Sequence, residues 1–152
     1  MHDSSSPVTD IDVFLMVSSN GGASWSGPTQ VDSGEGDQWF PWVDVNPTNG
    51  TIGILYNDRG PFNGALYVAS VVEGAPGSLA KTTVSARPSD PTQSRFFQSG
   101  VAGCENCAVF NGDYTNIEYG SDGKANMVWT DMSAPSEDIA GLFAQFIFYA
   151  RK

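Results

Sequence analysis

Histidine and cysteine are scarce in this sequence, which has one histidine, His2, and two cysteines, Cys104 and Cys107. Without a second histidine, a Ser-His-Asp triad has no base in the expected folded part, and a histidine-rich zinc site has too few ligands. The cysteines form one Cys-x-x-Cys pair with no second pair of ligands, so metal binding and redox catalysis are less favoured than a small disulfide loop. We therefore expect no metal, no cofactor and a Cys104–Cys107 disulfide formed in an oxidising compartment.

Basic residues and long apolar runs are also few. Seven Lys and Arg stand against 17 Asp and Glu, for a formal net charge of −10. Because binding to phosphate needs Lys and Arg, this balance opposes nucleic acid and anionic membranes as partners. No apolar run approaches the roughly 20 residues that cross a bilayer, and residues 1–7 lack the basic start and apolar core of a signal peptide.

What the sequence does contain is a composition typical of secreted all-β proteins. Charged residues make up only 16% of the chain, whereas glycine and aromatic residues are frequent. Such a composition favours short strands joined by many turns. We therefore expect a secreted or extracellular all-β protein, although no signal peptide is present in this chain.

Residues 40–59 have the pattern of a complete β-hairpin. Apolar side chains occupy alternate positions on both sides of a turn at residues 46–50, which ends in Asn-Gly. These alternating residues are Val43, Val45, Ile52, Ile54 and Tyr56. The pattern predicts two antiparallel strands.

The same hairpin pattern recurs at residues 113–131. Gly50 and Gly123 lie 73 positions apart, and the same offset pairs Asp58 with Asp131 and Tyr56 with Trp129. Before the turn the offset is 72, so the second copy has one extra turn residue. A repeat longer than about 40 residues and built of short strands is typical of propeller blades and similar arrays.

A turn near the start of the chain carries a recognisable motif. Ser18, Asn20, Gly22, Ser24 and Trp25 follow the spacing Ser-x-Asp-x-Gly-x-Thr-Trp, with asparagine in place of aspartate. This motif resembles the Asp-box of sialidase, or BNR-repeat, β-propellers. The resemblance implies a structural turn between the third and fourth strands of a blade, with its tryptophan buried as a packing anchor.

Together, the box and the repeat imply a partial β-propeller that resembles the C-terminal blades of this family. We expect about two and a half antiparallel four-stranded blades after a disordered polar tail at residues 1–10. Residues 11–33 would form two outer strands of one blade, residues 38–88 a full blade, and residues 108–152 three inner strands of the last. The chain would then be part of a longer propeller or an arc that assembles into a ring.

The family resemblance also directs attention to the residues near the inner strands. Sialidases hold the sugar carboxylate with three arginines and use a Tyr–Glu pair and an Asp acid, but the family's early arginine motif and acid-bearing loop have no counterpart here. The catalytic candidates are Asp113, Tyr114 and Arg59. The substrate-binding candidates are Gln38, Trp39, Asp58, Arg95 and Asp131. For each of these residues, turn capping or simple solvation is the alternative.

These observations predict part of a secreted sialidase-like glycoside hydrolase that is inactive by itself. Carbohydrate or a glycoconjugate would be the ligand, and the remaining blades or a second copy of the chain would be the partner. Two alternatives stay open: a non-catalytic carbohydrate-binding propeller that uses Trp39, Trp42 and Tyr114 as stacking platforms, and a purely structural arc. Fold alone does not choose among them.

Overall fold

The described part of the chain is built from β-strands. The structure is a computed structural model, and it describes residues 11–62, 66–93, 112–135 and 144–152. The strands are β1 (Phe14–Val17), β2 (Ser26–Gln30), β3 (Gln38–Val45), β4 (Ile52–Asp58), β5 (Val68–Ala75), β6 (Ser78–Thr83), β7 (Asn116–Tyr119), β8 (Ala125–Asp131) and β9 (Phe146–Arg151). Within these ranges the sole helical element is a 3-10 turn at Pro91–Gln93, and no helix there has the length and apolarity needed to cross a membrane.

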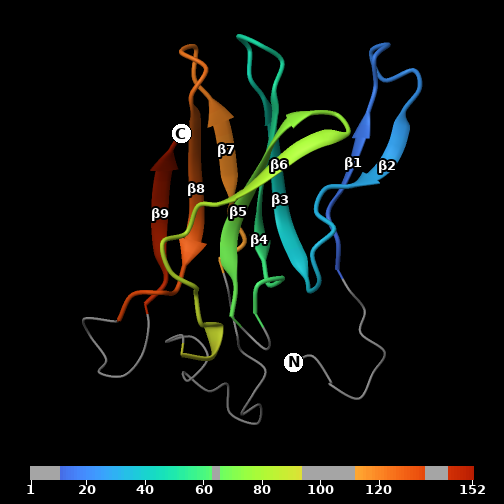
Figure 1. Cartoon of the computed structure of the whole chain (residues 1–152). Coiled ribbons are helices and arrows are strands. Elements are labelled where there is room, and N and C mark those ends of the chain that lie inside the picture. Colours follow the sequence, from blue (N-terminus) through green and yellow to red (C-terminus); the bar gives the residue numbers. More distant parts are fainter. Residues whose placement is uncertain (1–10, 63–65, 94–111, 136–143) are drawn as a thin grey trace.

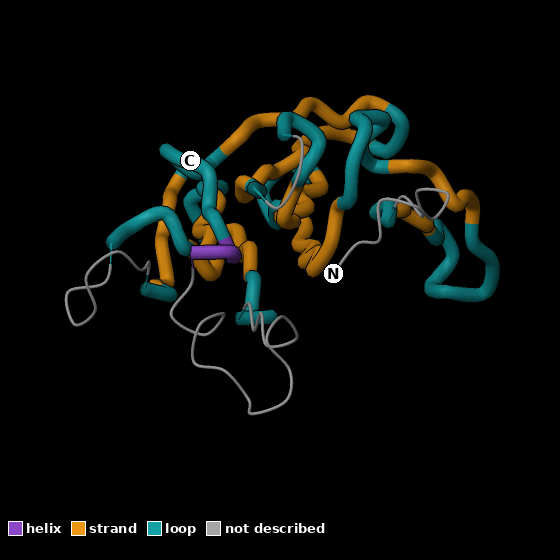
Figure 2. The backbone as a smooth tube through the Cα atoms, turned by 90° about the horizontal axis from the view of Figure 1, so that it is seen from below, coloured by secondary structure: helices purple, strands orange, loops and turns teal. Residues whose placement is uncertain are grey.

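The strands form three antiparallel sheets that lie side by side (Figures 1 and 2). The first sheet contains β1 and β2, the middle sheet has the order β3-β4-β5-β6, and the last sheet has the order β7-β8-β9. An all-β architecture of antiparallel sheets is thus confirmed, and the described strands per sheet match the expected two, four and three. That these sheets are propeller blades stays a prediction.

The two copies of the sequence repeat adopt the same local conformation. Gly50 and Gly123 both have left-handed backbones, with φ of 74° and 76°, in the turns that join β3 to β4 and β7 to β8. Asp58 Oδ1 accepts a hydrogen bond of 2.8 Å from the Gly60 amide, and Asp131 Oδ1 accepts one of 2.8 Å from the Ser133 amide. The sequence repeat is therefore also a structural repeat, and it includes the aspartate that binds a backbone amide at the end of each second strand.

Two apolar clusters hold the sheets together, one on each face of the middle sheet. Ile54 and Tyr56 of β4 pack with Val13 and Val31 of the first sheet region. The opposite face of the middle sheet contributes Leu55, Ala69 and Val71, which pack with Ile117, Met127 and Trp129 of the last sheet. In both copies the equivalent side chains of the second strand face the preceding sheet.

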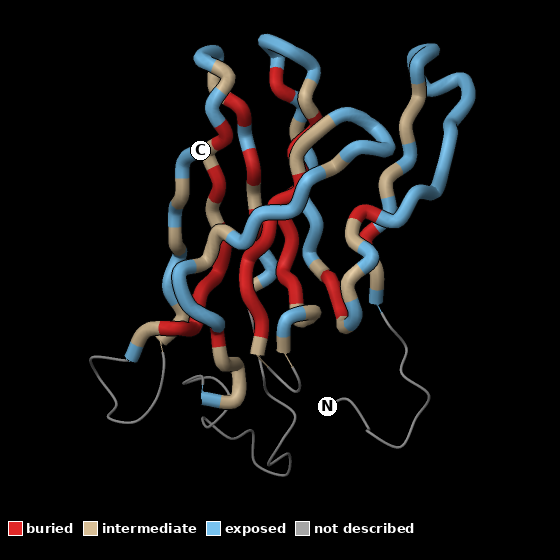
Figure 3. Tube along the Cα trace, viewed as in Figure 1, coloured by how far each residue is buried: buried red, intermediate tan, exposed pale blue. Residues whose placement is uncertain are grey.

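Strand β4 lies at the centre of the molecule and is buried on both faces (Figure 3). Every residue of β4 is buried, including Gly53 on the side of the last sheet. A Cβ atom at Gly53 would lie 2.5 Å from the hydroxyl oxygen of Tyr119. The glycine therefore permits the close approach of the last sheet to β4.

The last described sheet has β9 as its edge strand. Among the described strands β9 pairs with β8 alone. Its apolar side chains at Ile147 and Tyr149 are 68% and 59% exposed. In the described part of the chain, this strand therefore has an open edge and exposed apolar side chains.

The expectation that Trp25 is a buried anchor is wrong for this chain, because its side chain is 59% exposed. Trp25 follows the turn between β1 and β2, and the described residues of the first sheet include two strands only. Because no further sheet in the described part of the chain packs beyond this turn, the tryptophan lacks the neighbours that would bury it. Burial depends on what surrounds a motif, and the motif alone does not provide it.

Candidate functional site

The motif turn between β1 and β2 is held by its own side chains. Ser18 Oγ accepts the Gly22 amide at 2.8 Å, and Asn20 Oδ1 accepts the Ser24 amide at 2.9 Å. Asn20 Nδ2 also donates to Ser24 Oγ at 2.8 Å. The asparagine thus supplies the acceptor that an aspartate would supply, without the charge. These contacts give the motif a structural role.

Most of the candidate residues that the structure describes lie at one end of the sheets, the lower end in Figure 1. There β4 and β8 end, and β3 and β7 begin. Gln38 is paired with Asp58 across β3 and β4, and Trp39 with Asn57. Arg95, Cys104 and Cys107 lie outside the described residues, so the arginine and the disulfide stay predictions.

Arg59 is engaged by a neighbouring carboxylate. Its Nη1 lies 2.9 Å from Asp37 Oδ2, and the other Asp37 oxygen accepts the Ile11 amide. A carboxylate next to the guanidinium competes with a substrate carboxylate for the same donors. Arg151 pairs instead with Asp122, beside the turn at the other end of the sheets. Arg59 and Arg151 therefore do not contribute to one clamp.

Asp58 and Asp131 are buried and satisfied within the protein. Asp58 is fully buried and lies 2.6 Å from Lys81 Nζ. Asp131 accepts a hydrogen bond of 3.2 Å from the Trp129 indole nitrogen and further bonds from Ser133. Their contacts are those of residues that terminate strands and hold loops, the alternative that the sequence left open.

A charged network connects the loop before β3 with β4 and β6. Lys81 Nζ lies 2.5 Å from Asp32 Oδ2, which also accepts the Tyr56 hydroxyl at 3.0 Å. Burial alone would raise the pKa of Asp32, but hydrogen bonds from Lys81 and Tyr56 outweigh it and lower that pKa. Burial and the charge of Asp32 raise the pKa of Tyr56, so its hydroxyl stays protonated.

The pKa of Lys81 follows the same balance. Burial would lower it, but the hydrogen bonds with Asp32 and Asp58 outweigh burial and raise it. A protonated lysine between two carboxylates and a protonated tyrosine provide no group ready to accept or release a proton near neutral pH. The network is a structural tie between elements and does not have the form of a catalytic centre.

Asp113 and Tyr114 lie in the segment before β7 and are both exposed. The Tyr114 side chain is 83% exposed. The next residue, Thr115, donates from its hydroxyl to the Phe40 carbonyl at 2.6 Å, which joins the start of β7 to β3. Both candidates therefore precede β7, which begins at Asn116.

Sequence reasoning missed the strained backbone at Phe40. Its φ is 54°, in a region that bulky residues rarely adopt, and the pairing of β3 with β4 shifts between Trp39 and Trp42. Such strain is concentrated at functional positions in proteins. The available signal was Pro41, because proline within a strand marks a bulge or an edge.

Aromatic side chains surround this bulge. Phe40, Trp42 and Tyr114 are 37%, 49% and 83% exposed. Trp39 is less exposed and packs edge-on against Tyr67, with ring centroids 5.2 Å apart. Phe40 and Trp42 on β3 and Tyr114 in the segment before β7 are therefore all exposed, and we call these three residues the aromatic edge.

A buried amide lies close to the aromatic edge in the register of β3 and β4. Asn57, the partner of Trp39, is 1% exposed, and among the described residues neither its Oδ1 nor its Nδ2 has a hydrogen-bond partner. The Gln38 Oε1 atom likewise has no partner in the described part of the chain. Buried polar atoms normally find partners, so this part of the middle sheet holds unused hydrogen-bonding capacity.

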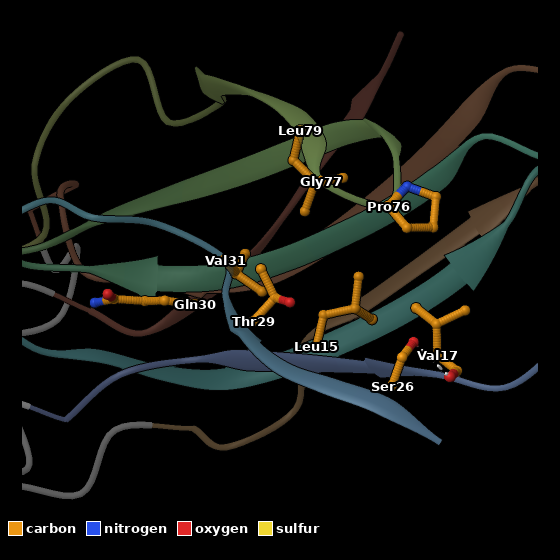
Figure 4. A pocket seen from close by; sticks show the side chains of 9 residues that line it. All are labelled: Leu15, Val17, Ser26, Thr29, Gln30, Val31, Pro76, Gly77 and Leu79. Atoms are coloured by element: carbon orange, nitrogen blue, oxygen red, sulfur yellow. Dashed lines mark hydrogen bonds between the residues drawn. The ribbon is translucent and has the colours of Figure 1, made fainter. Parts of the chain in front are cut away.

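A groove of about 220 Å³ lies between the first sheet and the turn from β5 to β6 (Figure 4). Leu15 and Val31 line one side, and Pro76 and Leu79 line the other. None of the residues lining it is charged, so it holds no acid or base. Among the described residues no group of His, Cys, Asp and Glu is arranged to hold a metal ion.

The chain matches no protein-family profile, and neither a curated protein nor a solved structure is significantly similar to it. The resemblance to Asp-box propellers therefore rests on the residues and on the repeat described above.

Proposed function

We propose that the chain is part of a secreted sialidase-like propeller and that it binds carbohydrate at the aromatic edge without hydrolysing sialosides by itself. The observation that carries this proposal is the set of exposed rings around the strained bulge at Phe40. Aromatic rings present flat apolar faces, and a tyrosine adds a polar tip, so they suit the apolar face and hydroxyl rim of a sugar ring.

Two of the described arginines, Arg59 and Arg151, support binding over catalysis. Arg59 is already paired with Asp37, and Arg151 lies with Asp122 at the other end of the sheets. A sialidase needs several guanidinium groups directed at one carboxylate together with an activated nucleophile. Asp113, Tyr114 and Arg59 stay candidates for catalysis only if further parts of a propeller complete the site.

Glycan binding is tested with Trp42→Ala and Tyr114→Ala. We expect the intact chain to bind glycans on an array, and each variant to lose at least tenfold in affinity for the strongest glycan in a fluorescence titration. Trp25→Ala is the matched control, because Trp25 is also exposed, at 59%, but lies in the turn between β1 and β2. We also expect no turnover of a fluorogenic sialoside.

Two results would contradict the proposal. An array without any bound glycan would remove carbohydrate as the ligand, and loss of binding in Trp25→Ala but not in Trp42→Ala would move the site elsewhere. Turnover of the sialoside by the isolated chain would show that the arginine argument is wrong.

A further inference from the structure

The repeat allows the two copies of the first hairpin strand to be compared position by position. Val43 and Val45 of β3 correspond to Thr115 and Ile117 at the start of the last sheet, 72 positions later. Val43 and Val45 are 54% and 51% exposed, whereas Thr115 and Ile117 are 5% and 1% exposed. Equivalent positions are thus covered in one copy and open in the other.

The cover in the second copy is the preceding sheet. Ile117 packs in one cluster with Leu55 of β4, and Thr115 is bonded to the Phe40 carbonyl of β3. A preceding inner hairpin, β3 and β4, therefore covers these positions. We call the equivalent face of β3, at Val43 and Val45, the front of β3.

The first sheet shows where the corresponding hairpin would lie. Residues 14–18 resemble residues 66–70 in sequence, and Leu15 packs against the cluster of Ile54 and Tyr56, so β1 and β2 take the place of a third and a fourth strand. In the middle sheet the third strand, β5, pairs on both sides. Among the described strands β1 pairs only with β2, so its other edge has open backbone groups.

We propose that the front of β3 and the open edge of β1 together form the docking site for an inner β-hairpin from a preceding repeat of a longer polypeptide. Its second strand would pair antiparallel with β1, and the hairpin as a whole would cover Val43 and Val45. This inference deepens the proposed propeller assignment and rests on it, but it is independent of sugar binding. Strand addition supplies affinity through backbone bonds, and alternate side chains supply specificity.

The chain itself provides a probe, because residues 113–133 contain a hairpin of this repeat. A fluorescein-labelled synthetic peptide of residues 113–133 is titrated with the full chain and followed by anisotropy. In a second format the same segment is joined to the start of the full chain by a flexible linker, which raises its effective concentration to the order of millimolar. Hydrogen–deuterium exchange of β1 and β3 is measured in both formats.

We expect saturable binding and at least tenfold slower amide exchange in β1 and β3. Val45→Asp should weaken peptide binding at least tenfold, because a charge would be buried in the contact. Ile147→Asp is the matched control, since Ile147 is also an exposed β-branched residue but lies on β9, and it should leave binding unchanged.

Three outcomes would overturn the docking site. These are unchanged exchange in the linked chain, protection of β9 in place of β1, and self-association of the free chain that Val45→Asp abolishes, which would make a second copy the occupant. Glycan binding is measured separately, so loss of one proposal leaves the other intact.

Discussion

At the scale of single residues, the two tryptophans Trp25 and Trp129 show how context decides a role. Trp25 belongs to a recognisable motif but is 59% exposed, whereas Trp129 belongs to a repeat and is 2% exposed. Trp129 packs between the middle and last sheets and donates its indole N–H to Asp131. The contribution of each tryptophan to folding stability therefore depends on how its side chain packs, and not on whether it belongs to a motif.

The two tryptophans therefore respond differently to truncation. Trp129→Ala should lower the free energy of unfolding by about 3 kcal/mol or more, because it leaves a cavity between two sheets. Trp25→Ala should cost less than about 1 kcal/mol, as substitutions at exposed positions do. Urea melts of the two variants provide the comparison, and a larger loss in Trp25→Ala would show that this ring is buried in solution.

At the scale of elements, Lys81 joins three segments that are distant in sequence. It contacts Asp32 in the loop before β3 and Asp58 at the end of β4 from its own position in β6. Asp58 is fully buried, so replacing Lys81 removes the cation that lies 2.6 Å from this carboxylate. The network therefore fixes the loop and both strands relative to one another.

Replacing Lys81 with methionine should lower the free energy of unfolding by about 2 kcal/mol, less than for a fully buried pair because the lysine is partly exposed. Arg151→Met is the control. Its pair with Asp122 is about half exposed on both sides, and its loss should change stability by less than about 0.5 kcal/mol. Equal losses in the two variants would contradict the proposed role of burial.

The same network determines how stability depends on acidity. The pKa of Asp32 is lowered in the folded state, so its contribution is present above the unfolded value near 4 and lost as the pH falls below it. Denaturant melts from pH 6 to pH 2 should therefore show falling stability in the intact chain. The fall should be shallower in the Lys81→Met variant, and a parallel fall would contradict the assignment.

The sequence predicted the sheets better than it predicted the site. Alternation around Asn-Gly and Asp-Gly turns is a local signal, so the hairpins ending in Asp58 and Asp131 were readable. The sequence did not predict that β4 is buried on both faces. A glycine and an asparagine, Gly53 and Asn57, alternate with its apolar residues, and this pattern is typical of a strand with one exposed face. The strain at Phe40 arises from the bulge, which depends on the pairing of two strands.

At the scale of the whole molecule, the described sheets leave two apolar faces exposed, the front of β3 and the face of β9 that carries Ile147 and Tyr149. Among the described residues the inner cores are complete, since the middle sheet is covered on both sides at β4. Exposed apolar side chains occur on strands of all three sheets, among them Phe14 on β1, Val45 on β3 and Ile147 on β9. The molecule therefore has a stable centre and incomplete ends.

The uncovered strand β9 makes the colloidal behaviour of the chain depend on ionic strength. An apolar edge strand invites pairing between molecules, and the net charge of −10 keeps identical chains apart. Salt shortens the range of that repulsion, to about 8 Å at 0.15 M and about 3 Å at 1 M. Turbidity should therefore rise with sodium chloride at constant pH, and Ile147→Lys should delay it. At low salt, the negative surface charge of this protein would then keep the β9 strands of neighbouring molecules apart.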